Sequence, residues 1–145
     1  MNHFSITADI PAAPERVWGI LADVERWPEW TPSVTRITRL DPGPLAVGSR
    51  ARIHQPRLLP ATWRIVELAE GRRFTWVTGS PGIRAVAEHS VEPIDRGSRV
   101  TLSVRFEGLL ASLVARLTRD LNRRYLELEA AGLRERSLSP ERRPS

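Results

Sequence analysis

The stretch from Pro11 to Val34, PAAPERVWGILADVERWPEWTPSV, decides the fold of this chain. Pro14 suits the first turn of a helix, where its missing N–H would have had no partner in any case. Val17, Trp18 and Leu21 then recur at helical spacing on one face. These features predict a short first helix with an apolar side.

A second short helix is predicted directly after the first. Asp23 is a natural N-cap, because its carboxylate can accept from the free backbone amides of Glu25 or Arg26. Pro28 keeps the helix brief, since proline cannot donate in a helix interior. The two helices form a bent, Trp-rich clamp inserted after the first strand, and we interpret this clamp as one side of a lined cavity.

The rest of the chain, as far as the final helix, consists of predicted strands separated by turn signals. The strands are Asn2 to Ile10, Val34 to Leu40, Arg50 to Gln55, Thr62 to Leu68, Arg73 to Thr78, Ile83 to Val91 and Arg99 to Phe106. The turns are Asp41 to Pro44, Glu70-Gly71, Ser80 to Gly82 and Asp95 to Gly97, where Gly and Pro supply the backbone angles that turns need. Short connections make neighbouring strands antiparallel. The expected class is α+β, with a curved antiparallel sheet of about seven strands.

Alternation along the strands predicts which side chains face inward. A chain reversal at Glu70-Gly71 places Ile65 opposite Trp76 and Glu67 opposite Phe74. The apolar pattern favours a four-residue turn in the last hairpin. The inner face then holds Trp63, Ile65, Phe74 and Trp76, and a row of Ala85, Ala87, His89 and Val91 that meets Val100, Leu102, Val104 and Phe106. The predicted outer face holds Arg84, Glu88, Glu92, Arg99, Thr101 and Arg105.

A long final helix, about Leu109 to Leu133, is predicted to cover the sheet. Apolar residues recur along it at spacings of three and four, and charged residues take the other side. Because Ala85 and Ala87 are small, we expect an apolar pocket where the first half of this helix crosses the sheet. The predicted apolar stripe is Leu110, Leu113, Val114, Leu117, Leu121, Tyr125 and Leu128; the charged side is Arg116, Arg119, Asp120, Arg123 and Glu127.

Length and composition favour one domain. The 145 residues are near the commonest domain size, and we assign residues 1–136 to a single domain. The polar segment from Arg134 onward lacks helical periodicity, so residues 137–145 are predicted to be a disordered tail. Cys is absent, which excludes disulfides and thiol chemistry. No signal core or apolar membrane span is found, so the expected location is cytoplasmic.

The net charge of +5 is interpreted as a solvated surface. Every basic side chain is Arg, and the arginines are scattered among acidic residues. On the final helix, Asp120 with Arg124 and Arg123 with Glu127 have the spacing of weak i, i+4 pairs. No nucleic-acid partner is therefore expected.

Three segments of the chain resemble the helix-grip superfamily of polyketide cyclases/dehydrases, START-type lipid-transfer domains and Bet v 1-like proteins. They are IPAAPERVW…LADVERWPEW (Ile10 to Trp30), GRRFTW (Gly71 to Trp76) and HSVEP…GSRVTL (His89 to Leu102), with a long helix last. The resemblance spans about Phe4 to Arg136. It implies an internal cavity, and the superfamily contains both enzymes and non-catalytic binding proteins.

The hypothesis that we favour is a protein, monomer or homodimer, that binds a small hydrophobic molecule such as a lipid or polyketide-like compound. Storage, transport and sensing are all compatible with it, and no cofactor or metal is implied, because His3, His54 and His89 are too dispersed. The alternatives are a polyketide cyclase/aromatase-dehydratase and an Hsp90-activator-like interaction module. The predicted ligand-binding residues are Trp30, Gln55, Trp63, Ile65, Phe74, Trp76, Ala87, His89, Leu102, Val104, Phe106, Leu113, Leu117 and Tyr125.

If the protein is an enzyme, His89 is the expected acid/base residue, because its ordinary pKa lies near neutrality. Glu67 at the rim could orient a ligand or His89, and Asn122 lies beside the apolar stripe. Each of these residues also has a purely structural interpretation. Two leucine pairs, Leu58-Leu59 and Leu109-Leu110, lie at strand ends. They either fold back onto the core or are exposed together as a portal for ligand delivery or as a transient contact for another protein or a membrane surface.

Overall fold

Seven antiparallel strands form one curved sheet in the order β1-β7-β6-β5-β4-β3-β2. The computed structural model describes residues 2–139. Its elements are β1 (His3–Ile10), α1 (Pro14–Ala22), the 3₁₀ helix η1 (Val24–Glu29), β2 (Arg36–Arg39), β3 (Arg50–His54), β4 (Ala61–Ala69), β5 (Arg73–Ser80), β6 (Ile83–Ile94), β7 (Gly97–Glu107), α2 (Ala111–Leu117) and α3 (Arg119–Leu138). The predicted α+β helix-grip architecture is confirmed.

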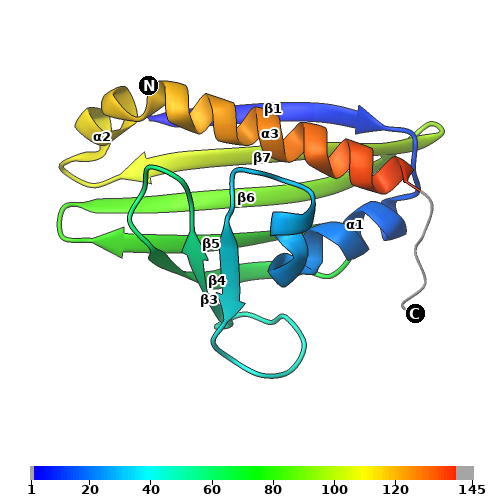
Figure 1. Ribbon diagram of the computed structural model, residues 1–145, viewed down its shortest axis with the longest axis horizontal. Coiled ribbons are helices and arrows are strands. Elements are labelled where there is room, and N and C mark those ends of the chain that lie inside the picture. Colours follow the sequence, from blue (N-terminus) through cyan, green and yellow to red (C-terminus); the bar gives the residue numbers. More distant parts are fainter. Residues whose placement is uncertain (1, 140–145) are drawn as a thin grey trace.

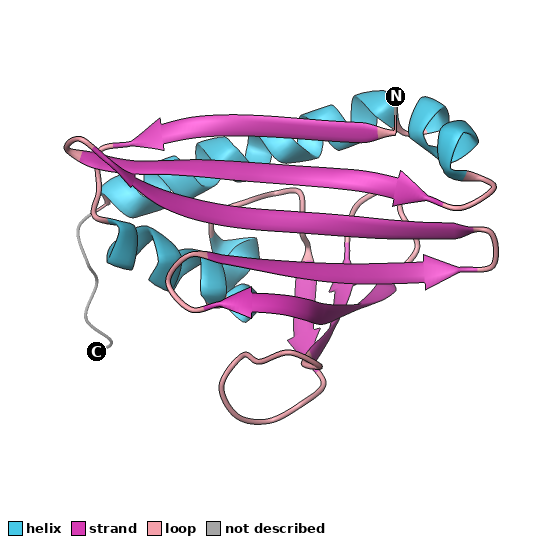
Figure 2. Cartoon of the chain, turned by 180° about the vertical axis from the view of Figure 1, so that it is seen from behind, coloured by secondary structure: helices cyan, strands magenta, loops and turns pink. Residues whose placement is uncertain are grey.

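All the helices lie on one side of the sheet. Helix α3 runs along β1 and β7, while α1 packs against α3, β6 and β7 (Figure 1). From behind, the long strands lie in front of the helices (Figure 2). The sheet therefore has one face that is covered by helices and one that is not, and the core lies between the sheet, α1, η1 and α3.

The clamp forms largely as predicted. Helix α1 begins at Pro14 and buries Val17, Trp18 and Leu21. The second helix is a 3₁₀ helix, and Asp23 does not cap it through its side chain; its carboxylate instead lies 3.4 Å from the Arg26 guanidinium. The expected cap is therefore wrong, although the helix begins where it was placed.

The hairpin registers agree with the alternation except at one position. In the last hairpin, Ala87 pairs with Val104 and His89 with Leu102, as predicted. Ile65 pairs with Trp76, but a β-bulge follows Ile65, so Glu67 pairs with Thr75 and not with Phe74. A bulge places an extra residue in one strand, which simple alternation cannot anticipate.

The predicted final helix is two helices, α2 and α3, that are separated at Thr118. The Thr118 hydroxyl donates to the carbonyl oxygen of Val114 at 2.6 Å, a side-chain bond that competes with regular helix geometry. Helix α2 turns Ala111 and Ala115 inward, whereas Leu113 and Leu117 are 54% and 74% exposed. The single predicted stripe is wrong in this half.

Helix α3 extends to Leu138, beyond the predicted start of the tail. Ser137 is buried, and Arg16 of α1 donates from Nε to the Ser137 carbonyl oxygen at 2.7 Å. A guanidinium at a helix C-terminus satisfies carbonyl groups that have no partner within the helix. Residues 137 and 138 thus belong to the folded unit, and residues 140–145 lie outside the described part of the chain.

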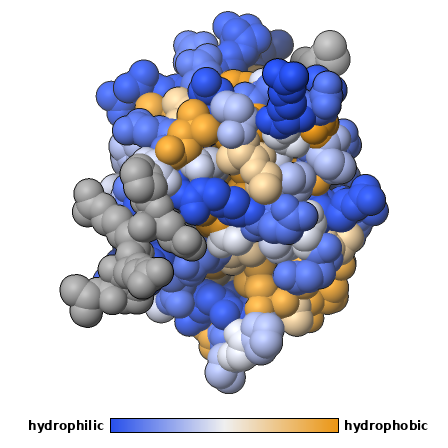
Figure 3. Space-filling model, turned by 90° about the vertical axis from the view of Figure 1, so that its right-hand side faces the viewer, coloured by the Kyte–Doolittle hydropathy of each residue, from blue (hydrophilic) through white to orange (hydrophobic). Residues whose placement is uncertain are grey.

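The charged surface consists of dispersed side chains. Cross-strand ion pairs join Arg99 to Asp9 at 2.9 Å and Arg105 to Glu88 at 2.6 Å. Within residues 2–139, neither i, i+4 pair expected on the final helix forms. Hydrophilic side chains alternate with small apolar groups on the face shown in Figure 3. A search of the described helices finds none with the length and apolar character that crossing a membrane requires.

Candidate ligand-binding cavity

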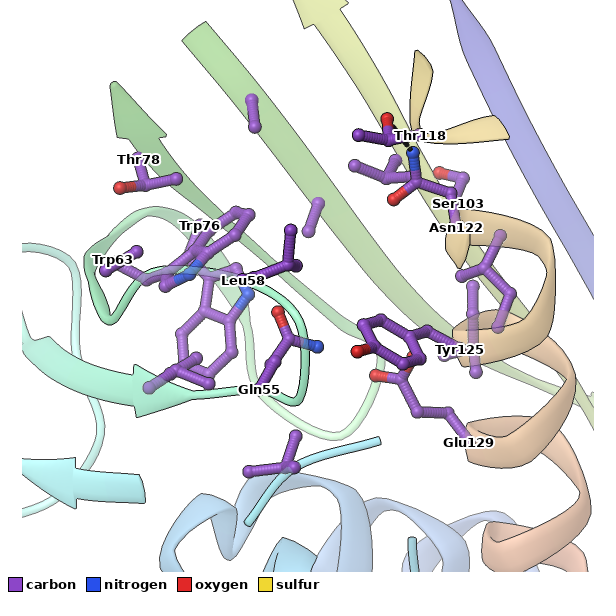
Figure 4. A pocket seen from close by; sticks show the side chains of 18 of the residues that line it. Gln55, Leu58, Trp63, Trp76, Thr78, Ser103, Thr118, Asn122, Tyr125 and Glu129 are labelled. Carbon is purple, nitrogen blue, oxygen red and sulfur yellow. Dashed lines mark hydrogen bonds between the residues drawn. The ribbon is translucent and has the colours of Figure 1, made fainter. Parts of the chain in front are cut away.

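A cavity of about 260 Å³ lies between the concave face of the sheet and the final helices. Side chains from η1, from strands β3 to β7, from the loop between β3 and β4, and from α2 and α3 line it. Figure 4 shows this space, with indole rings on the sheet side and polar side chains on the helix side. The hollow predicted between sheet and helix is therefore present.

Aromatic side chains form one wall of the cavity. The Trp63 and Trp76 rings are 6.0 Å apart between centroids, and Trp27 lies 5.5 Å from Trp76. Trp27 is fixed by its indole N–H, which donates to the Leu21 carbonyl oxygen at 2.9 Å. These rings offer flat apolar surfaces that stack well on a ring-containing ligand.

Small side chains on β6 create the free volume. Ala87 pairs with Trp76 on one side and with Val104 on the other, and Ala85 pairs with Phe106. The large side chains of β5 and β7 therefore extend further from the sheet than the Ala methyl groups between them, which leaves space above β6. An added large side chain at this row would fill the cavity from its floor.

His89 closes the inner end of the cavity as a neutral side chain. Its ring stacks on Phe74 with a centroid distance of 4.3 Å, and Nδ1 lies 3.3 Å from the Phe74 carbonyl oxygen. Because a carbonyl oxygen only accepts, Nδ1 carries the proton and Nε2 is left as an acceptor. Burial lowers the pKa of His89 from 6.5 to about 4, although the hydrogen bond to Phe74 opposes this shift.

Tyr125 and Glu129 lie one helical turn apart on α3 and face the cavity. The Tyr125 hydroxyl donates to the Pro56 carbonyl oxygen, which connects α3 to the loop after β3. Burial raises the pKa of Glu129 from 4.5 to about 8, with no basic group offsetting it. In Figure 4 the Tyr125 hydroxyl and the Glu129 carboxyl lie at the same end of the cavity, near the Gln55 amide.

A second polar group occupies the junction of α2 and α3. Asn122 donates from Nδ2 to the Thr118 hydroxyl oxygen at 2.8 Å, while Thr118 donates to Val114. Ser103 of β7 also lines the cavity on this side (Figure 4). The polar atoms are thus gathered near the helices, opposite the indoles.

Most of the residues predicted to contact a ligand lie on the cavity wall, and their role in binding stays a prediction. Trp30, Ile65 and Phe74 are instead packed in the core, where they support the wall from behind. Leu113 and Leu117 point to solvent, because the buried side of α2 holds Ala111 and Ala115. Those on the wall are Gln55, Trp63, Trp76, Ala87, His89, Leu102, Val104, Phe106 and Tyr125.

Sequence reasoning missed Glu129, the one carboxylate that lines the cavity within the described residues. The available signal was its i+4 spacing from Tyr125, but a charged residue is normally assigned to the solvent side of a helix. Glu67, expected near the rim, instead forms an exposed ion pair with Arg73 at 2.7 Å. The acidic residue at this site therefore comes from the helix and not from the sheet.

The two leucine pairs behave differently. Leu58 and Leu59 line the cavity, and Leu59 is 89% exposed, so this pair borders the opening. Leu109 is 98% exposed but does not line the cavity, and Leu110 packs on Gly82 of the β5–β6 turn. Only the first pair is placed to act as a portal. Residues 2–139 contain no group of three or more His, Asp or Glu side chains arranged to hold a metal ion.

The sheet, the clamp and the covering helix define a helix-grip protein with an internal cavity. Residues 1–137 match the family described as polyketide cyclase / dehydrase and lipid transport, and the chain belongs to that family. This finding confirms the resemblance inferred from the sequence.

Similar proteins cover almost the whole chain. An uncharacterized protein of Mycobacterium tuberculosis is 24% identical over 149 aligned positions, which cover 91% of this chain and 89% of that protein. The Zhui aromatase/cyclase from Streptomyces sp. R1128 has a TM-score of 0.75 at 19% identity, covering 93% of this chain and 92% of that one. The protein TTHA0849 from Thermus thermophilus has a TM-score of 0.74 at 22% identity, covering 94% and 97%. At these identities, the two solved structures show a shared fold.

Proposed function

We propose that this protein binds a small, compact hydrophobic molecule in the cavity between its sheet and α3. The observation that carries the proposal is the free volume of about 260 Å³ above Ala85 and Ala87, with indole walls and few polar groups. This volume is near the lower limit of about 300 Å³ for ligand pockets, which favours a ligand of one or two rings over a long acyl chain.

Thermal unfolding with a panel of lipophilic compounds tests this function. A ligand at about 100 times its dissociation constant adds about 2.7 kcal/mol to the free energy of unfolding, which raises the Tm by several degrees. Ala87→Trp should abolish the shift by filling the cavity. Glu92→Trp, on the outer face of the same strand, is the matched control and should keep it. A full shift in Ala87→Trp would place the ligand elsewhere.

A second candidate is the acid/base chemistry of a cyclase/dehydratase acting on a poly-β-ketone. The observation that favours it is the opposite perturbation of two groups in one cavity, since burial lowers the pKa of His89 and raises that of Glu129. At neutral pH, His89 is then a proton acceptor and Glu129 a proton donor, the division of roles that a dehydration requires. A pKa of about 4 makes His89 a weak base, which limits its contribution.

Turnover of a poly-β-ketone substrate tests this candidate. His89→Gln and Glu129→Gln should each lower the rate by about two to four orders of magnitude. Unchanged rates in both variants would remove these residues from catalysis. The interaction-module alternative would use the exposed leucines of α2, and it stays a prediction.

A further inference from the structure

Most hydrogen-bond donors among the side chains of the final helix that line the cavity already donate to other protein atoms. Thr118 donates to Val114, Asn122 donates to Thr118, and Tyr125 donates to Pro56. A hydroxyl has one proton, so Thr118 and Tyr125 have only lone pairs left to offer. The wall of α3 therefore presents mainly acceptors to the cavity.

Glu129 adds a carboxyl group to this wall. Without a cationic ligand the carboxyl keeps its proton at neutral pH, and it accepts hydrogen bonds from an ammonium group when that proton is released. Within residues 2–139, no ion pair or hydrogen bond involves this carboxyl, and burial is the sole cause of its raised pKa. The chain contains 22 Arg residues, yet none of those in the described range 2–139 lines the cavity. A carboxyl group without a cationic partner in a desolvated site is costly when ionised, and a cationic ligand would remove that cost.

His89 follows the same pattern at the inner end of the cavity. Because Nδ1 donates to the Phe74 carbonyl oxygen, the free ring nitrogen accepts. Gln55, which lies near Tyr125 and Glu129 in Figure 4, has an amide N–H that no protein group engages among the described residues. Along α3 and at His89, a ligand that contributes donors therefore finds more partners than a ligand that contributes acceptors.

We propose that the ligand is an amphiphilic amine whose ammonium group binds Glu129 and the Tyr125 hydroxyl oxygen, while its apolar ring lies against Trp63 and Trp76. This inference rests on the proposed binding function and adds the chemical class of the ligand. An ammonium group supplies three donors and the missing positive charge. In Figure 4 the indole wall and the Tyr125–Glu129 pair lie on opposite sides of the space, as a molecule with one polar end requires.

Three ligands with the same naphthyl ring test this proposal by isothermal titration calorimetry at about pH 7: naphthylmethylamine, naphthylmethanol and naphthoate. The wild-type protein should bind the amine at least about tenfold more tightly than the alcohol, and naphthoate most weakly. Glu129→Gln should weaken amine binding by about tenfold or more, which corresponds to about 1.4 kcal/mol, because it removes a charge-assisted hydrogen bond. It should change alcohol binding by less than about threefold.

The matched control is Glu127→Gln, which makes the same substitution at an exposed position on α3. It should leave all three affinities unchanged. Equal weakening of amine binding by both variants would show a long-range charge effect and overturn the contact with Glu129. Far-ultraviolet circular dichroism of each variant checks that the fold is retained.

The outcomes separate this inference from the proposed function. If the alcohol binds, Ala87→Trp blocks it, and the amine shows no preference for wild type over Glu129→Gln, the cavity binds ligands but the amine proposal is wrong. Tightest binding of naphthoate would also contradict it and would direct attention to Arg57, whose charge acts on Tyr125 from the β3–β4 loop. Binding of none of the three would count against both proposals.

Discussion

Replacing Glu129 by Gln should remove most of the pH dependence of stability between about pH 6.5 and pH 8. Burial raises the pKa of Glu129 from 4.5 to about 8, so in this interval the folded protein holds a proton that the unfolded chain has released. Stability is therefore lost as pH rises toward 8. At about 1.4 kcal/mol per pH unit, the free energy of unfolding should fall by about 2 kcal/mol.

The interval is chosen because His89 acts in the opposite direction at lower pH. Its pKa is lowered from 6.5 to about 4 on folding, so its contribution is complete above pH 6.5 and is lost as pH falls toward 4. Between pH 4.5 and 6.5 the two groups largely offset each other. Asp9 and Asp41, whose pKa values are lowered by Arg99 and Arg50, act only at still lower pH.

Urea denaturation followed by Trp fluorescence at several pH values measures this effect. The wild-type protein should lose stability across the interval, Glu129→Gln should give a nearly flat profile, and Glu127→Gln should follow the wild type. A Glu129→Gln profile that runs parallel to the wild type would refute the assignment of a buried, proton-retaining carboxyl at this position.

Two matched pairs of substitutions test the packing of the helices. Gly132→Ala should destabilise the protein by about 2 kcal/mol or more in urea denaturation, because its Cβ would clash with the Trp30 carbonyl oxygen. Gly19→Ala, with open space around it in α1, should add about 0.5–1 kcal/mol; equal effects would contradict this packing. Leu133→Ala should cost about 2–5 kcal/mol, and Leu117→Ala less than about 0.5 kcal/mol. A large loss of stability in Leu117→Ala would contradict the exposed position of this side chain on α2.

The sequence predicts the sheet and the clamp well because both depend on local signals. Pro14 starts a helix for steric reasons, and the register of the last hairpin follows from matching two apolar rows across one turn. The bulge after Ile65 has no comparable signal in the sequence, because the next residue, Val66, is acceptable both in a regular strand and in a bulge. The position of Glu67 was wrong for this reason.

The covering helix is predictable only in part. Periodicity was applied on the assumption that the largest apolar residues of a helix mark its buried face, whereas α2 buries the small side chains of Ala111 and Ala115. Leu113 and Leu117 were assigned inward on that assumption. Exposed leucines in α2 show that an apolar stripe alone does not establish burial.

The candidate site is predictable from the sheet side but not from the helix side. Trp76, Ala87 and His89 follow from alternation, since each strand has only two faces. The role of Glu129 cannot be predicted in this way, because it depends on whether a cationic side chain lies nearby in the folded structure. With 22 Arg residues in the chain, the composition would instead favour an Arg partner for this carboxyl.

The most direct test of the cavity is an NMR measurement of nuclear Overhauser effects between bound naphthylmethylamine and the protein. Ring protons of the ligand should show contacts with the methyl groups of Ala85 and Ala87 and with the Trp76 indole. Contacts confined to the exposed leucines Leu113 and Leu117 would place the ligand on the surface of α2 and contradict binding in the cavity.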